Sequence, residues 1–269
     1  MKKLNWGIIG LGKIAESFSK GFFEVNNGKL LSVASRDATK LKKFKDIYNL
    51  DEKYLFKNYE ELISCKDVDI IYVALPNTLH HYWVSKIIEK NKSVLVEKPA
   101  TISLFEAKSI YEKIKDKKLF FGEAFMYRYL PQTKLVIEML QNQEIGEIFS
   151  MESSFGMNLL TKKKFLFFNK KKKFDPSDRK FNKDLGGGSI YDLGCYPSSF
   201  SLLVNSIVNK KKSNNFDVIN VSRELGQTGV DIDSSAEVLF ENGFSSKIHS
   251  SFKKNLGNQT TIMGKKGKI

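Results

Sequence analysis

Three polar side chains in two segments have the residue types and spacing of a proton-transfer site. Asp192 and Tyr196 are four residues apart in the run GGGSIYDLGCYP, so on a helix they would share one face. A carboxylate beside a phenol forms a pair that can transfer a proton, and a nearby lysine would help the phenol to ionise. Lys98 is the candidate for that lysine. The alternative is that Tyr196 is a buried tyrosine with a satisfied hydroxyl group.

The run Glu97-Lys98-Pro99 directly follows the apolar segment 93–96, which predicts a strand. That places the lysine at the carboxyl end of a parallel strand, where ligands bind in such sheets. There it can hydrogen-bond a substrate hydroxyl group and lower the pKa of a neighbour by its charge. Pro99 fixes the turn. Glu-Lys-Pro is also a common surface turn, which is the alternative interpretation.

The N-terminal run LNWGIIGLGKIA predicts a strand, a glycine turn and a helix. Gly10 permits a tight turn, Gly12 lets the backbone approach a pyrophosphate, and Ala15 allows close packing of helix and strand. The helix that follows points free N–H groups and its positive dipole end at the phosphates. This pattern indicates a dinucleotide site, and the alternative is a tight turn that binds nothing.

The end of the second strand decides which dinucleotide is preferred. An acid at this position binds the ribose of NAD, whereas NADP requires a cation. The sequence reads Ser35-Arg36-Asp37, so Arg36 can stack on the adenine and pair with a 2′-phosphate, with Ser35 adding a hydrogen bond. Asp37 is either a ribose acid or the cap of a helix over 38–48. We favour NADP(H) and keep NAD(H) as the alternative.

The run PNTLHH follows the third predicted strand in the same way. His80 is the candidate for the cofactor side. The alternative is that Asn77 or Thr78 caps the next helix and that both histidines, His80 and His81, lie in its first turn.

These segments must be held by alternating strands and helices. In the first half we expect strands at 4–9, 30–35, 68–74, 93–96 and 119–123 and helices at 38–48, 59–64, 78–90 and 102–116. Such alternation predicts a parallel, doubly wound sheet. In the second half we expect helices at 130–142 and 189–206, strands at 146–156, 216–225, 234–241 and 244–252, and an irregular stretch at 157–185. This pattern predicts a mostly antiparallel second domain.

Composition narrows the function classes. The net charge is +14, but only four of the 44 basic residues are arginines, and arginine is the preferred reader of bases and phosphates. We therefore expect no nucleic-acid partner. The dense lysine run within 162–173 is either a polyanion patch or a solvated loop. Two distant cysteines without metal spacing favour a reduced, cytoplasmic protein with no metal site. The N-terminal apolar stretch is too short for a membrane span.

Taken together, these motifs resemble the Gfo/Idh/MocA oxidoreductases. GLGKIA, PNTLHH, VEKPA, GEAFMYRYLPQ and GGGSIYDLGCYP occur in the family order over nearly the whole chain. The last two are most similar to the subgroup of trans-dihydrodiol and D-xylose dehydrogenases. The resemblance implies a Rossmann domain over 1–123 and an α/β domain with a large open sheet over 124–269. It also implies NAD(P)-dependent oxidation or reduction of a sugar, cyclic polyol or diol.

The resemblance implies Lys98 as a catalytic residue, and Tyr196 takes a position that is histidine in many members but a tyrosine acid/base in the dihydrodiol branch. We expect Asp192 to orient the sugar or the proton donor. The expected cofactor-binding residues are Gly10, Gly12, Lys13, Ile14, Ser35, Arg36, Leu75, Asn77, His80, Glu97 and Lys98.

The family usually continues beyond residue 269. We therefore expect an open sheet edge and an altered or weakened homodimer through the C-terminal sheet. The alternative function is a non-catalytic dinucleotide-binding protein with a shortened second domain.

Overall fold

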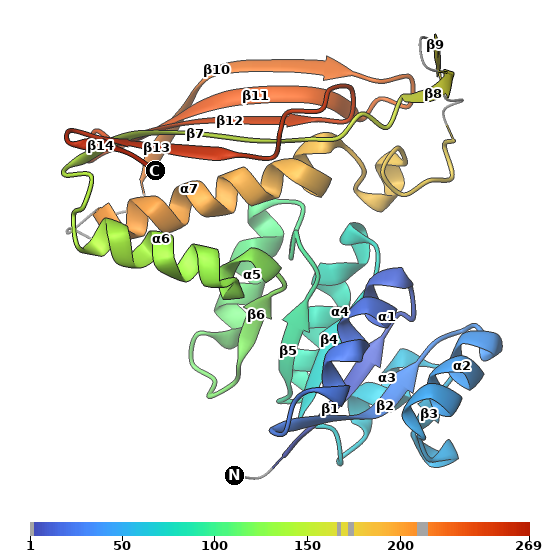
Figure 1. Cartoon of the computed structure of the whole chain (residues 1–269). Coiled ribbons are helices and arrows are strands. Elements are labelled where there is room, and N and C mark those ends of the chain that lie inside the picture. The colour runs from blue at the N-terminus through green and yellow to red at the C-terminus, as the bar shows by residue number, and fades with distance from the viewer. Residues whose placement is uncertain (1–2, 166–167, 172–174, 209–214) are drawn as a thin grey trace. The chain divides into compact units, whose positions relative to one another are not determined.

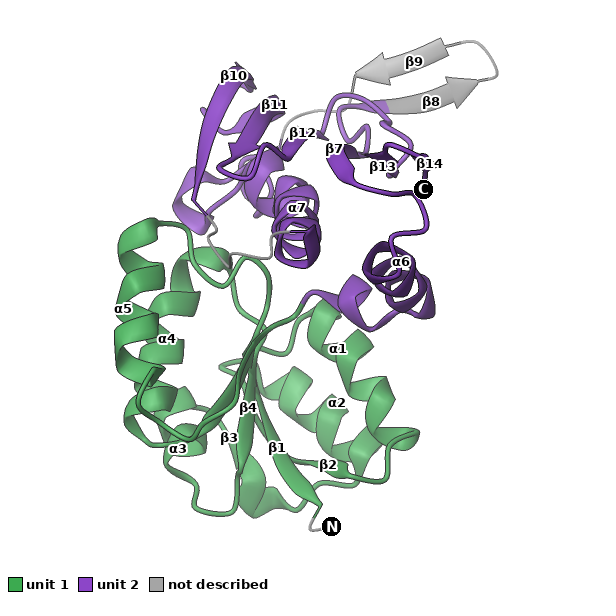
Figure 2. Ribbon diagram, turned by 90° about the vertical axis from the view of Figure 1, so that its left-hand side faces the viewer, with its two compact units in different colours: residues 1–124 green, residues 125–269 purple. Residues whose placement is uncertain are grey.

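The computed structural model describes residues 3–165, 168–171, 175–208 and 215–269, and the chain forms two compact units (Figure 2). Unit 1 is Met1–Ala124 and unit 2 is Phe125–Ile269, so the boundary falls one residue beyond the expected one. The side chains of the lysine run within 162–173, for which a polyanion patch and a solvated loop are the two interpretations, lie outside the described residues.

Unit 1 contains a parallel sheet. Within the described residues its strands are β1 (Leu4–Ile9), β2 (Gly28–Ala34), β3 (Leu55–Phe56), β4 (Ile70–Val73), β5 (Ser93–Val96) and β6 (Phe121–Glu123), in the order β3-β2-β1-β4-β5-β6. All neighbouring pairs run parallel. The β4 residues are buried on both faces, which explains the almost continuous apolar run in the sequence. The predicted doubly wound sheet is confirmed.

Helices cover both faces of this sheet (Figure 2). Apolar side chains of α1 (Lys13–Ser19) and α2 (Ala38–Tyr48) pack in one buried cluster with the sheet. Those of α3 (Tyr59–Ser64), α4 (Asn77–Glu89) and α5 (Leu104–Ile114) pack in a second. Asp37, Asn58 and Ser103 cap α2, α3 and α5 by accepting bonds from first-turn amides. Short 3₁₀ turns lie at Lys20–Phe23 and Glu52–Tyr54.

Unit 2 contains a mixed sheet (Figure 1). Within the described residues its strands are β7 (Ile148–Gly156), β10 (Phe216–Leu225), β11 (Asp231–Phe240), β12 (Ser245–Ser251), β13 (Thr260–Gly264) and β14 (Gly267–Lys268), in the order β10-β11-β12-β7-β13-β14. The β12–β7 pair is parallel and the other pairs are antiparallel. The sheet is therefore mostly antiparallel, as expected.

Two helices pack on one face of the second sheet, α6 (Pro131–Gln141) and α7 (Cys195–Val208) (Figure 1). Leu140 of α6 and Val204 of α7 share a buried cluster with Met151, Phe240 and Ile262 of the strands. A π-helix, Ile190–Gly194, leads directly into α7. Further 3₁₀ turns lie at Met126–Tyr129 and Lys183–Leu185.

The expected irregular stretch 157–185 differs from the structure in one respect. It contains two paired strands, β8 (Thr161–Phe165) and β9 (Phe168–Lys171), which form a separate antiparallel pair. Their sequence is dominated by lysine and has no alternation of apolar and polar residues. The sequence therefore lacks the local signal on which strand prediction depends.

Candidate active site

The glycine turn after β1 has the geometry that its sequence suggested. Gly10 has a φ of +86°, and a Cβ there would lie 2.5 Å from the carbonyl oxygen of Ala74. Gly12 occupies the N-cap of α1, where no side chain of the described structure caps the helix. A Cβ on Gly12 would meet nothing within 4 Å. Lys13 and Ile14 are exposed on the first turn. The helix start is thus open to a phosphate group.

In the segment after β2, the side chains of Ser35 and Asp37 form local hydrogen bonds, and that of Arg36 does not take part in them. The Asp37 carboxylate accepts bonds from the Thr39 amide at 2.9 Å and from the Thr39 hydroxyl at 2.6 Å. The hydroxyl bond is the main reason why the pKa of Asp37 lies below its usual value. The Ser35 hydroxyl accepts from the Asp37 amide at 3.1 Å. Asp37 therefore serves as the helix cap, which was one of its two expected roles.

Arg36 is exposed and lies against Tyr59, the first residue of α3. Burial raises the pKa of the Tyr59 phenol, and the charge of the Arg36 guanidinium and its hydrogen bond to the phenol oppose that shift. The Tyr59 ring in turn packs edge-on against Trp83, with the ring centroids 5.0 Å apart. Tyr59 therefore limits where the guanidinium can lie.

The Glu97–Ala100 segment after β5 is held at three points around Lys98. The Tyr72 hydroxyl donates to Glu97 from the neighbouring strand β4. The Ala100 amide donates to the Glu123 carboxylate at 2.7 Å, and the carbonyl oxygen of Pro99 lies 2.8 Å from Nδ1 of His80. The Lys98–Pro99 peptide bond is cis. These contacts fix the backbone on both sides of the lysine.

The PNTLHH segment contributes its backbone and one buried ring. Pro76 occupies the N-cap of α4, so the alternative in which Asn77 or Thr78 caps this helix is wrong. The Asn77 side chain is buried. The His80 side chain is also fully buried, and its Nε2 lies 2.8 Å from the carbonyl oxygen of Leu75. His81 instead contacts the Ser109 hydroxyl at 3.1 Å.

Asp192 lies in the π-helix, and Tyr196 lies in the first turn of α7. The sequence argument placed both on one regular α-helix, and the structure differs because a π-helix ends between them. The Asp192 side chain is only 10% exposed and its carboxylate lies 3.2 Å from the Arg179 guanidinium. Arg179 is half exposed and comes from the turn that precedes the glycine run.

The glycine run 186–188 allows close packing of the chain at the start of the π-helix. Gly188 has a φ of +120°, and a Cβ there would lie 2.2 Å from Oδ1 of Asp231. Oδ2 of the same carboxylate accepts from the Ile190 amide at 2.9 Å and from the Ser189 hydroxyl at 2.6 Å. Asp231 therefore ties the beginning of β11 to the helix that carries Asp192.

Aromatic rings surround Tyr196 within unit 2. The ring centroids of Phe155, Phe125 and Tyr127 lie 5.3, 5.6 and 6.3 Å from that of Tyr196. The hydroxyl groups of Tyr127 and Ser199 lie 2.9 Å apart, and the Arg128 guanidinium donates to Ser199 at 3.3 Å. The GEAFMYRYLPQ segment therefore holds the first turns of α7 and the ring of Tyr196.

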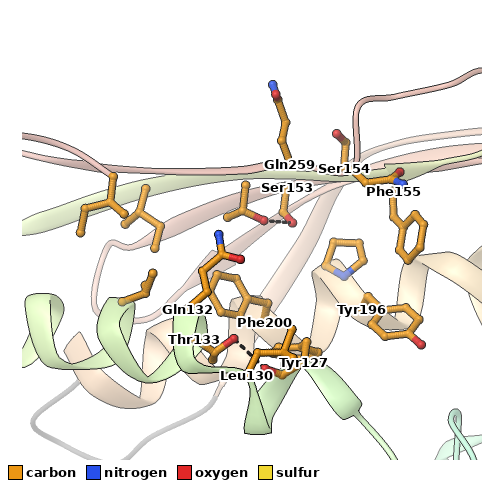
Figure 3. A pocket seen from close by; sticks show the side chains of 16 residues that line it. Tyr127, Leu130, Gln132, Thr133, Ser153, Ser154, Phe155, Tyr196, Phe200 and Gln259 are labelled. Atoms are coloured by element: carbon orange, nitrogen blue, oxygen red, sulfur yellow. Dashed lines mark hydrogen bonds between the residues drawn. The ribbon is translucent and has the colours of Figure 1, made fainter.

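A cavity of about 460 Å³ lies between α6, α7 and the sheet of unit 2 (Figure 3). Tyr196 and Phe155 lie together at one end of it (Figure 3). The Ser153 and Thr260 hydroxyl groups, 2.7 Å apart, and the Gln132 and Gln259 side chains also line it. The cavity thus combines aromatic walls with hydroxyl and amide groups.

The expected site residues fall into two groups. The cofactor candidates and Lys98 lie in unit 1, after β1, β2, β4 and β5, at the carboxyl edge of its sheet. Asp192 and Tyr196 lie in unit 2. Sequence reasoning missed Arg179, Tyr59, Tyr72, Glu123 and Asp231. Only Tyr72 gave a usable signal, because a phenol inside a buried apolar strand needs a hydrogen-bond partner.

Among the described residues, no group of three or more His, Cys, Asp and Glu side chains is arranged to hold a metal ion. In the same part of the chain, no helix is long and apolar enough to cross a membrane.

Comparison with known proteins gives matches over both units. Residues 4–125 match the family model "Oxidoreductase family, NAD-binding Rossmann fold", and residues 133–269 match the "GFO/IDH/MocA C-terminal domain". Trans-1,2-dihydrobenzene-1,2-diol dehydrogenase of Xenopus laevis is 28% identical over 98% of this chain and 74% of its own length. D-xylose 1-dehydrogenase (NADP(+)) of Hypocrea jecorina is 33% identical over 72% of this chain and 51% of its own length.

Solved structures share the fold. Aldose-aldose oxidoreductase from Caulobacter crescentus, complexed with glycerol, aligns with a TM-score of 0.83 at 22% identity, over 99% of this chain and 76% of the other. The 3-ketoreductase KijD10 from Actinomadura kijaniata, in complex with NADP and TDP-benzene, aligns with a TM-score of 0.80 at 23% identity, over 98% and 74% of the two chains.

Proposed function

The chain belongs to the Gfo/Idh/MocA oxidoreductase family, and on that premise we propose that it transfers a hydride between NADP(H) and a carbinol carbon of a sugar, cyclic polyol or diol. Unit 1 is the NAD(P)-binding domain in this proposal, and unit 2 is the substrate-binding and dimerisation domain. The observation that carries the proposal is the clamped Glu97–Ala100 segment, which presents Lys98 at the same sheet edge as the glycine turn.

The residues of unit 1 fit a dinucleotide. The uncapped start of α1 and the open space in front of Gly12 support binding of the pyrophosphate there. Arg36, directed by Tyr59, would pair with the 2′-phosphate of NADP(H). Because Asp37 is engaged as a helix cap, it competes poorly for a ribose hydroxyl group. The segments at Leu75–Asn77 and Glu97–Lys98 would line the nicotinamide end.

Three side chains of this chain would handle the substrate hydroxyl group. When bound, the nicotinamide supplies the hydride chemistry. Tyr196 takes or returns the hydroxyl proton at its phenol oxygen. Lys98 hydrogen-bonds the substrate oxygen, and its charge favours the ionised form of the phenol. Asp192, held by Arg179, orients the sugar or the proton donor. The aromatic rings around Tyr196 keep its ring in place.

The substrate class is inferred from the relatives and from the second unit. The named relatives act on a dihydrodiol and on D-xylose. The cavity beside Tyr196 offers hydroxyl and amide groups that can hydrogen-bond a polyol and aromatic walls that can stack on a ring.

A homodimer through the sheet of unit 2 is part of the proposal. The face opposite α6 and α7 carries polar side chains, including the Glu152–Lys247 pair at 3.6 Å. A Ser235→Arg variant, placed on this face, should shift the molecular mass in solution toward the monomer. The free cysteines Cys65 and Cys195 are in keeping with a cytoplasmic protein.

The test combines binding with turnover. NADPH and NADH titrations followed by fluorescence should show a preference for NADPH, and NADP⁺ should be reduced in the presence of an aldopyranose or a cyclic trans-diol from a panel. Preference for NADH would overturn the cofactor assignment. Tight NADPH binding without turnover on any sugar, polyol or diol would instead favour a non-catalytic dinucleotide-binding protein.

A further inference from the structure

His80 makes two short contacts that a neutral histidine cannot both satisfy as hydrogen bonds. Its Nδ1 lies 2.8 Å from the carbonyl oxygen of Pro99, and its Nε2 lies 2.8 Å from that of Leu75. A carbonyl oxygen only accepts, so each ring nitrogen must carry a hydrogen to form its bond. Neutral imidazole has one N–H, and the imidazolium has two. The side chain is fully buried, so water does not compete for either position.

We propose that His80 is held as an imidazolium that joins the ends of β4 and β5 and positions the backbone of Lys98. Both bonds are then charge-assisted, and such bonds are roughly twice as strong as neutral ones. A neutral ring would leave one ring-nitrogen lone pair facing a carbonyl oxygen at 2.8 Å, and in this proposal that repulsion outweighs the desolvation cost that burial imposes on the charged ring. The role assigned to Lys98 rests on the proposed function, but the protonation state of His80 does not.

The two carbonyl groups belong to the segments that matter most for the nicotinamide end. Leu75 lies two residues after the end of β4 and two residues before the start of α4, while Pro99 directly follows Lys98. By bonding to both carbonyl groups, the imidazolium fixes the distance between the segment at Leu75 and the segment at Pro99. Tyr72 and Glu123 hold the same Glu97–Ala100 segment through Glu97 and the Ala100 amide. Of these three contacts, the one from His80 holds the Pro99 carbonyl group.

Other titratable groups share these segments. Lys98 and Glu97 lie on the loop after β5, Tyr72 on β4, Glu123 on β6 and His81 on α4. At this edge of the sheet, Glu97 and Glu123 are acidic residues, and His80 and Lys98 are basic ones. A positively charged ring at this edge of the sheet also suits a site for an anionic dinucleotide.

NMR of the histidine ring nitrogens tests the protonation state directly. The chain has three histidines, so His81→Gln and His249→Gln variants assign the His80 signals by elimination. At about pH 8, where an ordinary histidine with a pKa near 6.5 is neutral, both ring nitrogens of His80 should give the signals of protonated nitrogen. A signal of unprotonated nitrogen from His80 at that pH would overturn the proposal.

Hydrogen exchange tests the positioning role. In a His80→Gln variant, the Lys98 and Ala100 amides should exchange about tenfold faster or more, the equivalent of losing one hydrogen bond to a charged group. The matched control is His81→Gln, which alters the adjacent histidine and its contact with Ser109. Equal exchange in the two variants would show that His80 does not position the segment. If the protein turns over no substrate, the proposed function fails, whereas the NMR and exchange results still decide the role of His80.

Discussion

The Arg179 guanidinium lies 3.2 Å from the Asp192 carboxylate, and the two side chains differ sharply in exposure. Asp192 is nearly buried at 10%, while Arg179 is 51% exposed. The arginine comes from a turn just before the glycine run, and the carboxylate comes from the π-helix after it. The pair therefore holds this turn against the helix that leads to Tyr196.

We expect Arg179→Met to lower the free energy of unfolding by about 1–2 kcal/mol, between the values typical of exposed and buried ion pairs. The physical reason is that the nearly buried Asp192 carboxylate loses this guanidinium. Urea unfolding measures the effect. Arg223→Met, on the exposed strand β10, is the matched control. Equal losses in the two variants would mean that the Asp192 contact contributes nothing.

Arg36→Ala should weaken NADPH binding by about 1–3 kcal/mol, the scale of a charge-assisted contact, and leave NADH binding nearly unchanged. Tyr59→Phe removes the hydrogen bond to Arg36 and should reduce the preference in the same direction by a smaller amount. Fluorescence titration with both cofactors measures this. The assignment of Arg36 fails if both cofactors lose affinity equally.

Lys98→Ala and Tyr196→Phe should each lower kcat by about 10²–10⁴-fold, the usual contribution of general acid–base catalysis, while affinity for NADPH stays close to that of the wild type. In the proposed mechanism the two groups act together, so the double variant should lose far less than the product of the single losses. Tyr129→Phe, at an exposed tyrosine in the 3₁₀ turn Met126–Tyr129, is the control. A Tyr196→Phe enzyme with most of its activity would make Tyr196 a structural residue.

The Asp233 carboxylate should make the stability of unit 2 depend on pH. Partial burial raises its pKa, but hydrogen bonds from His249, Ser251 and Lys254 outweigh that effect and hold the pKa below its usual value. A depressed pKa in the folded state stabilises the protein above the ordinary aspartate pKa, and this stabilisation is lost as the pH falls through the folded-state value.

Asp233→Asn should therefore lower the thermal unfolding midpoint near neutral pH, and the difference from the wild type should shrink below about pH 4. Asp217→Asn on β10 serves as the control for removing a carboxylate from an exposed strand. If the difference between Asp233→Asn and the wild type stays constant down to acidic pH, the effect does not come from the charge of Asp233.

The sequence predicted those elements best whose ends carry their own signals. The predicted helices 38–48 and 59–64 agree with α2 and α3 at both ends, because Asp37 and Asn58 cap them. The strand predicted at 4–9 agrees with β1, and the glycine turn that follows it was also predicted. The parallel β12–β7 pair could not be predicted, because pairing between distant strands leaves no local pattern. The π-helix was also missed, since its residues are compatible with an ordinary α-helix.

The candidate site was predicted as single residues but not as contacts. Residue type and spacing make Lys98, Asp192 and Tyr196 candidates, and their catalytic roles stay predictions. The groups that hold them were not predicted, because Arg179 is one arginine in a basic chain and Glu123 contacts a backbone amide 23 residues away in the sequence. Such partners depend on the folded chain, so no local spacing in the sequence reveals them.

The contact between Gly188 and Asp231 has a practical consequence for engineering. A Cβ at position 188 would lie 2.2 Å from Oδ1 of Asp231, and the other oxygen of that carboxylate already holds Ser189 and the Ile190 amide. A mutant library that aims to change substrate range should therefore keep positions 188 and 231 constant. Exposed positions in the preceding turn, such as Lys183, tolerate randomisation better, because a new side chain there extends into solvent.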